Sequence, residues 1–346
     1  MELSAGASLP ELLLTYRDGL RVPLRDGSTL ESDAGWSCTL RSTQTLVANA
    51  LVRADAAKYT VTSSARLFDD NSGVLGLGAL LHVSIGGEVR RWRGPGEAAH
   101  LMQRAGLRAE INQLPFAIIA QADATIVERE VFTSNTHLAL ILLPLRLNES
   151  ARLSESSAAG LCAACAIPFF VGAVAGTLGH SLTIVGVSDQ GSSTFLALDP
   201  HRVQAAETAS LVALDGDRVT VSATDLDPSV SLGFLVRPCD FSSFRSRLQR
   251  DLPVSFPAIR ASSAATSDLL ADSPVSGEWI DAAADADDAE GPLSHPPAPD
   301  VVDFLAHLAR HTAVGASRVW QQMMSAWRAV VRSTARTAAS HRVHGD

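Results

Sequence analysis

Short apolar runs bounded by turn-forming residues constrain the fold of this chain more than any other feature. Two of them, residues 182–187 and 195–198, are separated by the segment Ser-Asp-Gln-Gly-Ser-Ser. That segment has the composition of a turn, so the two runs predict buried strands joined as a hairpin. The runs 138–145 and 232–236 predict two further strands.

Residues after Leu40 follow a helical repeat, in which Val47 and Leu51 lie on one face. Helices before and among the strands, up to about residue 250, predict an α+β domain. We expect a mainly antiparallel sheet flanked by helices. Hydrophobic residues make up 46% of the chain, which is enough to bury a core of that kind.

The composition changes sharply near residue 255. Residues 261–300 contain nine acidic residues and no Lys or Arg. Such a segment buries too little apolar surface to offset its chain entropy. We therefore predict a folded domain over residues 1–253 and a disordered acidic linker over residues 254–300.

Beyond the linker the sign of the charge reverses. Residues 301–346 contain six Arg and two Asp, and Trp320, Met323 and Trp327 recur at three- or four-residue spacing. This pattern predicts a basic amphipathic helix. Such a helix either packs on the folded domain or binds a membrane surface or a partner, and the sequence leaves both open.

Charge and cysteine content exclude several classes of protein. The net charge of −9 argues against a nucleic-acid binder, which needs a basic surface. Four cysteines are too few for a disulfide framework in 346 residues. No apolar run reaches the roughly 18 residues of a membrane span, and the N-terminal residues lack signal-peptide features. We expect a cytoplasmic protein.

Cys38 lies where a Gly-containing loop leads into the predicted helix. A thiol at a helix N-terminus meets unpaired backbone N–H groups and the positive end of the helix dipole, which together lower its pKa. A lone cysteine is also commonly a small buried hydrophobe. The pair Cys162 and Cys165 has redox or zinc spacing, but no second such pair accompanies it. We interpret that pair as structural, with redox regulation as the alternative.

The predicted hairpin supplies two possible bases for the Cys38 thiol. His180 opens its first strand, and Asp199 and His201 follow its second strand. A thiol protease needs an imidazole beside the thiol and a group that orients the imidazole. His180 with Asp199 across the hairpin meets this need. Asp199 and His201 also meet it, because residues two apart in an extended chain point to one side.

Six segments, in order, resemble the autophagins, a family of autophagy-related cysteine proteases. The segments are Tyr16-Arg17, residues 32–44, Trp92-Arg-Gly-Pro95, residues 180–186, Leu198-Asp-Pro-His201 and residues 227–241. The resemblance extends from about residue 10 to residue 250. It implies a papain-like cysteine protease fold.

The resemblance also implies a role for each matching residue. Cys38 is the expected nucleophile, His201 the expected base and later acid, and Asp199 the expected orienting carboxylate. Tyr16 is expected to line the oxyanion hole together with the Cys38 backbone N–H. No metal or organic cofactor is expected.

The implied substrate is the autophagy ubiquitin-like modifier. The expected reactions are cleavage after its C-terminal glycine and hydrolysis of its amide bond to phosphatidylethanolamine, in the cytoplasm and transiently at autophagic membranes. Trp92 is expected to cover the passage for that glycine, with His180 as a neighbouring substrate-binding residue. One alternative is a related thiol hydrolase, such as a deubiquitinase, that uses His180 as its base. The other is a catalytically weak paralogue that binds the modifier without cutting it.

Two departures from the autophagin pattern lie near the expected site. Ser37 stands where the family usually has Gly before the nucleophile. Residues 172–177, Gly-Ala-Val-Ala-Gly-Thr, stand where the family has a flexible loop before the strand that His180 opens. We expect these residues to form a loop with altered gating.

Overall fold

A computed structural model describes residues 11–262, except 85–88, 110–112, 122–123, 134–135, 178, 189–192, 208–211, 215–217, 254–255 and 258. The part of the predicted acidic linker from residue 263 onward and the predicted basic helix of residues 301–346 lie outside the described residues.

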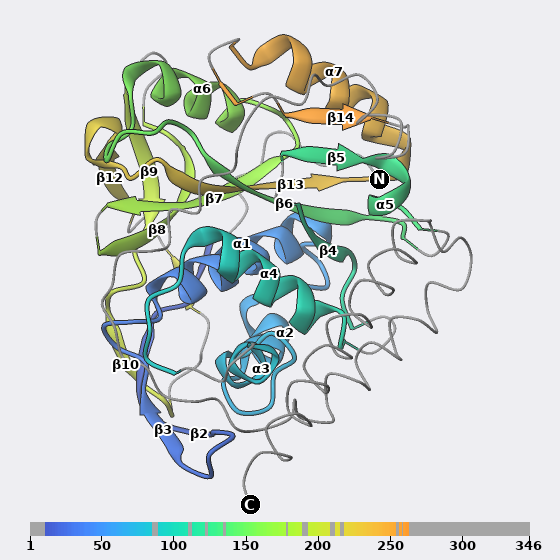
Figure 1. The fold of residues 1–346 in the computed structure, drawn as a ribbon. Helices are drawn as coiled ribbons and strands as arrows, with labels where there is room; N and C mark the ends of the chain where they lie inside the picture. The colour runs from blue at the N-terminus through green and yellow to red at the C-terminus, as the bar shows by residue number, and fades with distance from the viewer. Residues whose placement is uncertain are drawn as a thin grey trace, which may run out of the picture. The chain divides into compact units, whose positions relative to one another are not determined.

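A seven-stranded sheet forms the centre of the domain, in the order β12-β9-β8-β7-β13-β6-β4 (Figure 1). Its strands are β4 (Ala117–Ala120), β6 (Ala139–Arg146), β7 (Phe170–Thr177), β8 (His180–Val187), β9 (Thr194–Leu198), β12 (Val219–Ser222) and β13 (Ser229–Val236). Neighbouring strands are antiparallel except β4 and β6, which are parallel. The four predicted strands and the β8–β9 hairpin are therefore confirmed.

Helices cover both faces of this sheet, as Figure 1 shows. One face carries α1 (Cys38–Ala54) and α4 (Pro95–Gly106), and the other carries α6 (Glu155–Cys165) and α7 (Phe241–Asp251). Successive residues of β6 point to opposite faces: Leu140 packs in the core beneath α1, and Ile141 packs in the core beneath α6 and α7. This confirms the expected α+β class.

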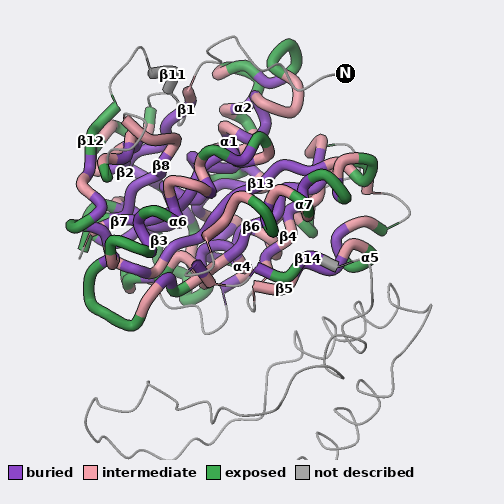
Figure 2. Tube along the Cα trace, turned by 90° about the horizontal axis from the view of Figure 1, so that it is seen from above, coloured by how far each residue is buried: buried purple, intermediate pink, exposed green. Residues whose placement is uncertain are grey.

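Burial follows from this layered arrangement. In Figure 2 the strands β6, β7 and β13 and most of α1 are coloured as buried. Strands with both faces covered have continuous apolar sequences, which is why residues 138–145 predicted a buried strand so clearly.

The other helices are α2 (Val61–Ala65), η1 (Arg66–Phe68), α3 (Leu77–Val83), α5 (Glu128–Val131), η2 (Ala223–Asp225) and η3 (Pro238–Asp240).

A three-stranded sheet joins segments that are far apart in the chain. Its strand β2 (Tyr16–Pro23) pairs antiparallel with β3 (Thr29–Ser32) and parallel with β10 (Val203–Ala205). Tyr16 stands opposite Val203 in this parallel pairing. The N-terminal segment is therefore held beside the residues that follow β9. The strand β1 (Glu11–Leu13) pairs with β11 (Val212–Leu214).

The expectation that residues 172–177 form a loop with altered gating is wrong. They belong to β7, which ends at Thr177, and β8 begins at His180. A Cβ atom at Gly176 would lie 2.0 Å from the His180 carbonyl oxygen. The missing side chain therefore permits close approach of the two strands, and it does not indicate flexibility.

The packed chain continues beyond residue 253, the predicted end of the domain. Phe256 is buried, and its ring lies where a side chain at Gly160 of α6 would project. The strand β14 (Arg260–Ser262) then pairs in parallel with β5 (Thr125–Val127). The buried apolar residues Phe256, Ile259 and Ala261 precede the first acidic residue of the predicted linker, Asp268, which explains why packing continues this far.

Candidate active site

Cys38 is the first residue of α1, and its side chain is fully buried. The loop from β3 turns into the helix through Gly35, whose φ of +84° lies in the left-handed region that favours glycine. The Cys38 sulfur therefore lies at the N-terminus of a 17-residue helix, where unpaired N–H groups favour a negative charge.

Asp199 and His201 form a hydrogen-bonded pair immediately after β9. Nδ1 of His201 lies 2.5 Å from Oδ1 of Asp199, and the backbone N–H of His201 donates to the same oxygen at 3.0 Å. One carboxylate oxygen thus fixes both the ring and the backbone. Nε2 of His201 is buried, and because Asp199 takes Nδ1, it is the ring nitrogen that is left to interact with the Cys38 thiol.

Cys38 and His201 shift each other's pKa in opposite directions. Burial opposes ionisation of the thiol, but interactions with His201, the Ser181 backbone N–H and Tyr16 outweigh it and lower the pKa of Cys38. Burial also opposes protonation of His201, but Asp199 and Cys38 outweigh it and raise the pKa of His201 to about 9. The arrangement favours a thiolate–imidazolium pair near neutral pH.

Tyr16 lies against this pair from the start of β2. Its ring meets the His201 ring edge-on, with 5.3 Å between centroids. Burial and the negative charge of Cys38 raise the pKa of Tyr16, so the phenol keeps its proton and remains a donor. A buried hydroxyl donor beside a thiol at a helix N-terminus can stabilise an oxyanion formed on attack.

His180 and Trp92 complete the group of predicted residues. The His180 ring, on the first residue of β8, lies 4.4 Å from the His201 ring between centroids. Trp92 is 51% exposed, and its Cη2 lies 3.7 Å from the position of a Cβ at Gly179. The indole therefore covers the turn that precedes His180. The structure brings all six predicted site residues together.

A buried group of charged side chains beneath the site was not predicted. Arg41 has no exposed side-chain surface and lies between two carboxylates, with Nε 2.7 Å from Oδ2 of Asp33 and Nη1 2.8 Å from Oδ1 of Asp70. The helical repeat gave no signal for it, because Arg41 lies roughly 100° around the helix from Leu40 and so off the face that Leu40 shares with Val47. A charge on a buried helix face requires a partner.

The remaining cysteines have different surroundings. Cys162 and Cys165 lie on α6 without a disulfide, and burial raises the pKa of each. Raised values keep a thiol protonated and unreactive. Within the described ranges, no group of three or more His, Cys, Asp or Glu residues is arranged to hold a metal ion.

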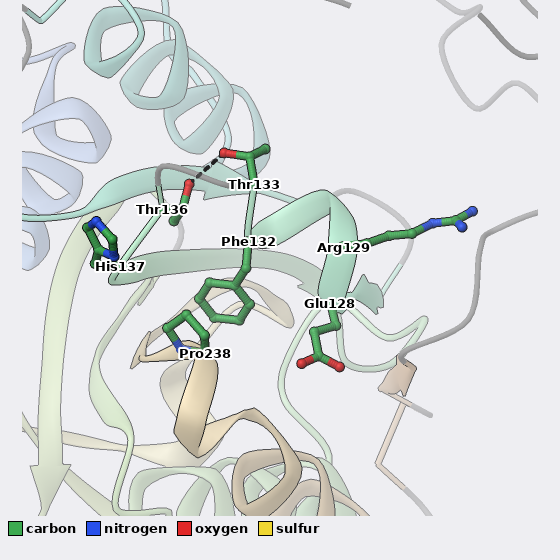
Figure 3. A pocket seen from close by; sticks show the side chains of 7 residues that line it. All are labelled: Glu128, Arg129, Phe132, Thr133, Thr136, His137 and Pro238. Atoms are coloured by element: carbon green, nitrogen blue, oxygen red, sulfur yellow. Dashed lines mark hydrogen bonds between the residues drawn. The ribbon is translucent and has the colours of Figure 1, made fainter. Parts of the chain in front are cut away.

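An open cavity of about 490 Å³ lies between α5 and η3 (Figure 3). Its lining includes Phe132, His137 and Pro238, and a hydrogen bond of 3.0 Å joins Thr133 and Thr136 at its rim. None of the six predicted site residues lines this cavity. The chemistry of the site therefore lies elsewhere, around Cys38.

The α+β fold and the thiol–imidazole–carboxylate arrangement define a papain-like cysteine protease. The particular family follows from comparison with known proteins. The family model described as the Peptidase C54 catalytic domain matches residues 7–247, and the chain belongs to this family. The resemblance to the autophagins is thereby confirmed.

Curated relatives carry matching names. The chain is 28% identical over 221 residues to the "Probable cysteine protease ATG4" of Meyerozyma guilliermondii, which covers 62% of this chain and 52% of the relative. It is 27% identical over 236 residues to the "Probable cysteine protease atg4" of Schizosaccharomyces pombe. This match covers 65% of this chain and 70% of the relative. For the "Cysteine protease ATG4a" of Arabidopsis thaliana the identity is 26% over 275 residues. This match covers 66% of this chain and 56% of the relative. The match thus spans about half the length of the first and third of these relatives.

In the part of the chain that the structure describes, no helix combines the length and the apolar character needed to cross a membrane.

Proposed function

We propose that this protein cleaves the autophagy ubiquitin-like modifier after its C-terminal glycine and hydrolyses the amide bond between that glycine and phosphatidylethanolamine. The Cys38–His201–Asp199 arrangement carries the proposal, because it supplies a nucleophile, a proton carrier and an orienting carboxylate. The membership of the Peptidase C54 family and the names of the relatives support it.

Acylation begins from the thiolate–imidazolium pair. The Cys38 sulfur attacks the carbonyl carbon of the glycine, and the electron pair of the C=O bond moves to oxygen. The Cys38 backbone N–H and the Tyr16 hydroxyl donate to that oxyanion. The C–N bond then breaks as His201 gives its Nε2 proton to the leaving amine, and a thioester remains.

Deacylation follows the same path with water as the nucleophile. His201, now neutral, accepts a proton from water, and the hydroxide attacks the thioester carbonyl through a second oxyanion. Collapse restores the Cys38 thiolate beside the protonated His201 and releases the glycine as a carboxylic acid, which loses its proton to solvent. The leaving amine belongs to a peptide in one reaction and to phosphatidylethanolamine in the other, so one site serves both.

Substrate selection is assigned to Trp92 and His180. Cys38 has no exposed surface, and the Trp92 indole lies against the turn at Gly179, so we assign the approach of the substrate to that covered turn. An indole over such a passage admits a glycine, which has no side chain, and excludes larger residues. Binding there leaves His180 beside the substrate chain.

Cleavage of a modifier that carries a C-terminal reporter tests the proposal. We expect cleavage to disappear in Cys38→Ala and His201→Ala and to persist in part in His180→Ala. The reverse pattern for the two histidines would assign the base to His180 and favour a related thiol hydrolase, which a ubiquitin–reporter fusion would reveal. Tight binding without turnover would identify a non-cutting paralogue.

Release of modifier from vesicles that carry its phosphatidylethanolamine conjugate tests the second reaction separately.

The sequence beyond the described residues motivates a further part of the proposal. We propose that the acidic linker connects the protease domain to the basic helix of residues 301–346, and that this helix binds autophagic membranes transiently from the cytoplasm. Flotation of the full chain with anionic vesicles tests this, and replacing Arg328 and Arg332 by Glu should abolish it. Flotation that is unchanged in the double variant would contradict the membrane role.

A further inference from the structure

The carboxylate of Asp33 joins the neighbours of both proposed oxyanion donors. Its Oδ1 accepts a hydrogen bond of 2.6 Å from the backbone N–H of Arg17, the residue after Tyr16. Its Oδ2 accepts a hydrogen bond of 2.5 Å from the hydroxyl of Ser37, the residue before Cys38. One side chain therefore connects the two segments that must meet at the oxyanion.

The Asp33 side chain is itself held in place by the Arg41 guanidinium. Arg41 donates from Nε to Oδ2 of Asp33 at 2.7 Å, and from Nη1 and Nη2 to the two oxygens of Asp70 at 2.8 and 3.2 Å. The side chains of Asp33 and Arg41 have no exposed surface. The two carboxylates outweigh burial and raise the pKa of Arg41, so its charge is retained. A planar guanidinium between two carboxylates fixes both of them in direction.

The Cys38 thiolate has partners other than Asp33. His201, the Ser181 backbone N–H and Tyr16 stabilise the Cys38 thiolate. The Asp33 carboxylate accepts hydrogen bonds from Arg41 and from the residues next to Cys38 and Tyr16. Through Ser37 it bears on the placement of the Cys38 amide, whereas the thiolate keeps His201 and the Ser181 N–H as partners of its own.

We propose that Asp33 is the positioning residue of the oxyanion hole and that the Ser37 hydroxyl is the link through which it places the Cys38 amide. This inference rests on the proposed function. A glycine at position 37, as in the autophagin motif, has no hydroxyl with which to make this bond. Dependence on Ser37 is therefore a property of this chain.

The test compares Ser37→Ala with the wild-type protein on the modifier–reporter fusion. Complete loss of one oxyanion donor lowers kcat by about 10²- to 10³-fold, and displacement of a donor costs part of that. We expect kcat to fall about tenfold in Ser37→Ala with KM within about twofold of wild type. Asp33→Asn should also lower kcat, because its single acceptor oxygen cannot serve both the Arg17 N–H and the Ser37 hydroxyl.

Two additional measurements separate positioning from general damage. The pH profile of Cys38 alkylation by iodoacetamide should be unchanged in Ser37→Ala, because the thiolate keeps its own partners. Ser157→Ala is the matched control: Ser157 is also buried, and its hydroxyl donates to the Leu147 carbonyl at 2.9 Å on the opposite face of the sheet. We expect its kcat to equal that of wild type.

Acetylation of Cys38 by p-nitrophenyl acetate gives a readout without the modifier, because ester attack also forms an oxyanion. It too should slow about tenfold in Ser37→Ala. Unchanged acetylation, an equal loss in Ser157→Ala, or a shifted alkylation profile would each overturn the proposal, even if Asp33→Asn does not fold. If wild type leaves the modifier intact but acetylation still depends on Ser37, the proposed function fails and the positioning role stands.

Discussion

The backbone N–H of Tyr16 donates a hydrogen bond of 3.0 Å to the carbonyl oxygen of Pro200. Pro200 stands between Asp199 and His201, so this bond ties the proposed oxyanion donor directly to the loop that carries the proposed base. The parallel pairing of β2 with β10 continues the connection, with Tyr16 opposite Val203. The edge contact between the Tyr16 and His201 rings follows from that register.

The opposite pKa shifts of Cys38 and His201 predict the pH dependence of the site. The thiolate forms at a pH below that of an ordinary thiol, and His201 keeps its proton up to about pH 9. Cleavage should decline above about pH 9, because His201 then has no proton for the leaving amine. In stability terms, the raised pKa of His201 contributes fully below its unfolded value of about 6.5. That contribution is lost as the pH rises through about 9.

Alkylation by iodoacetamide measures the thiolate directly, with Cys38→Ala giving the background from the other cysteines. In His201→Ala the midpoint should move up toward the value of an ordinary thiol, about 8.5. An unmoved midpoint would show that His201 does not stabilise the thiolate.

The close approach of β7 and β8 predicts a sharp difference between two glycines. A methyl group at Gly176 would meet the His180 carbonyl oxygen, which is backbone and cannot rotate away, whereas one at Gly186 of β8 would have nothing within 4 Å. We expect Gly176→Ala to lower the free energy of unfolding by about 1–3 kcal/mol and Gly186→Ala to change it by less than about 0.5 kcal/mol. Urea unfolding of both variants measures this. Equal stabilities would contradict the packing between β7 and β8.

The exposed indole of Trp92 predicts a change in selectivity without loss of fold. In Trp92→Ala the preference for glycine over alanine at the cleavage site, expressed as a ratio of kcat/KM values, should fall at least about tenfold. Because the side chain is 51% exposed, thermal unfolding should change little. Leu107→Ala, at an even more exposed apolar residue, is the control and should keep the ratio. A ratio that survives in Trp92→Ala would remove the indole from substrate selection.

The buried position of Arg41 predicts a large stability effect. Arg41→Met leaves Asp33 buried without its cation and leaves Asp70 with Arg17 alone, at 4.0 Å, which costs about 3–5 kcal/mol. The control is Arg247→Ala, which breaks a pair whose side chains are 42% and 26% exposed and should cost less than about 1 kcal/mol. Guanidinium unfolding curves compare the two. A near-neutral Arg41→Met would mean that the carboxylates find other partners.

Local signals in the sequence predicted the central elements well. The runs that became β6, β8, β9 and β13 are apolar because both faces of the sheet are covered, and α1 has a clear helical repeat. Gly172 and Gly176 led to the wrong prediction of a loop over residues 172–177, because glycine occurs both in flexible loops and where two strands approach closely. Only the approach of β8 distinguishes these, and that is a tertiary contact.

The site could be predicted as a set of residues but not as an arrangement. Spacing alone left His180 and His201 as equal candidates for the base. The 2.5 Å contact between His201 and Asp199 is what pairs that carboxylate with His201. The parallel pairing of β2 with β10 has no local sequence signal, because the strands are short and distant. The buried set around Arg41 was missed for the same reason, since Asp70 comes from a loop after η1.

The pairing of β2 with β10 also determines when the chain can become active. The Arg17 guanidinium contacts the Gln204 side chain across a separation of 187 residues, and most of the domain lies between them. A protein made from its N-terminus exposes Cys38 early, but Tyr16 gains its partner loop only after residue 205 has been synthesised. A contact of such long range forms late in folding. Until then the thiol has neither its proposed base nor its proposed oxyanion donor in place, so the catalytic arrangement is incomplete.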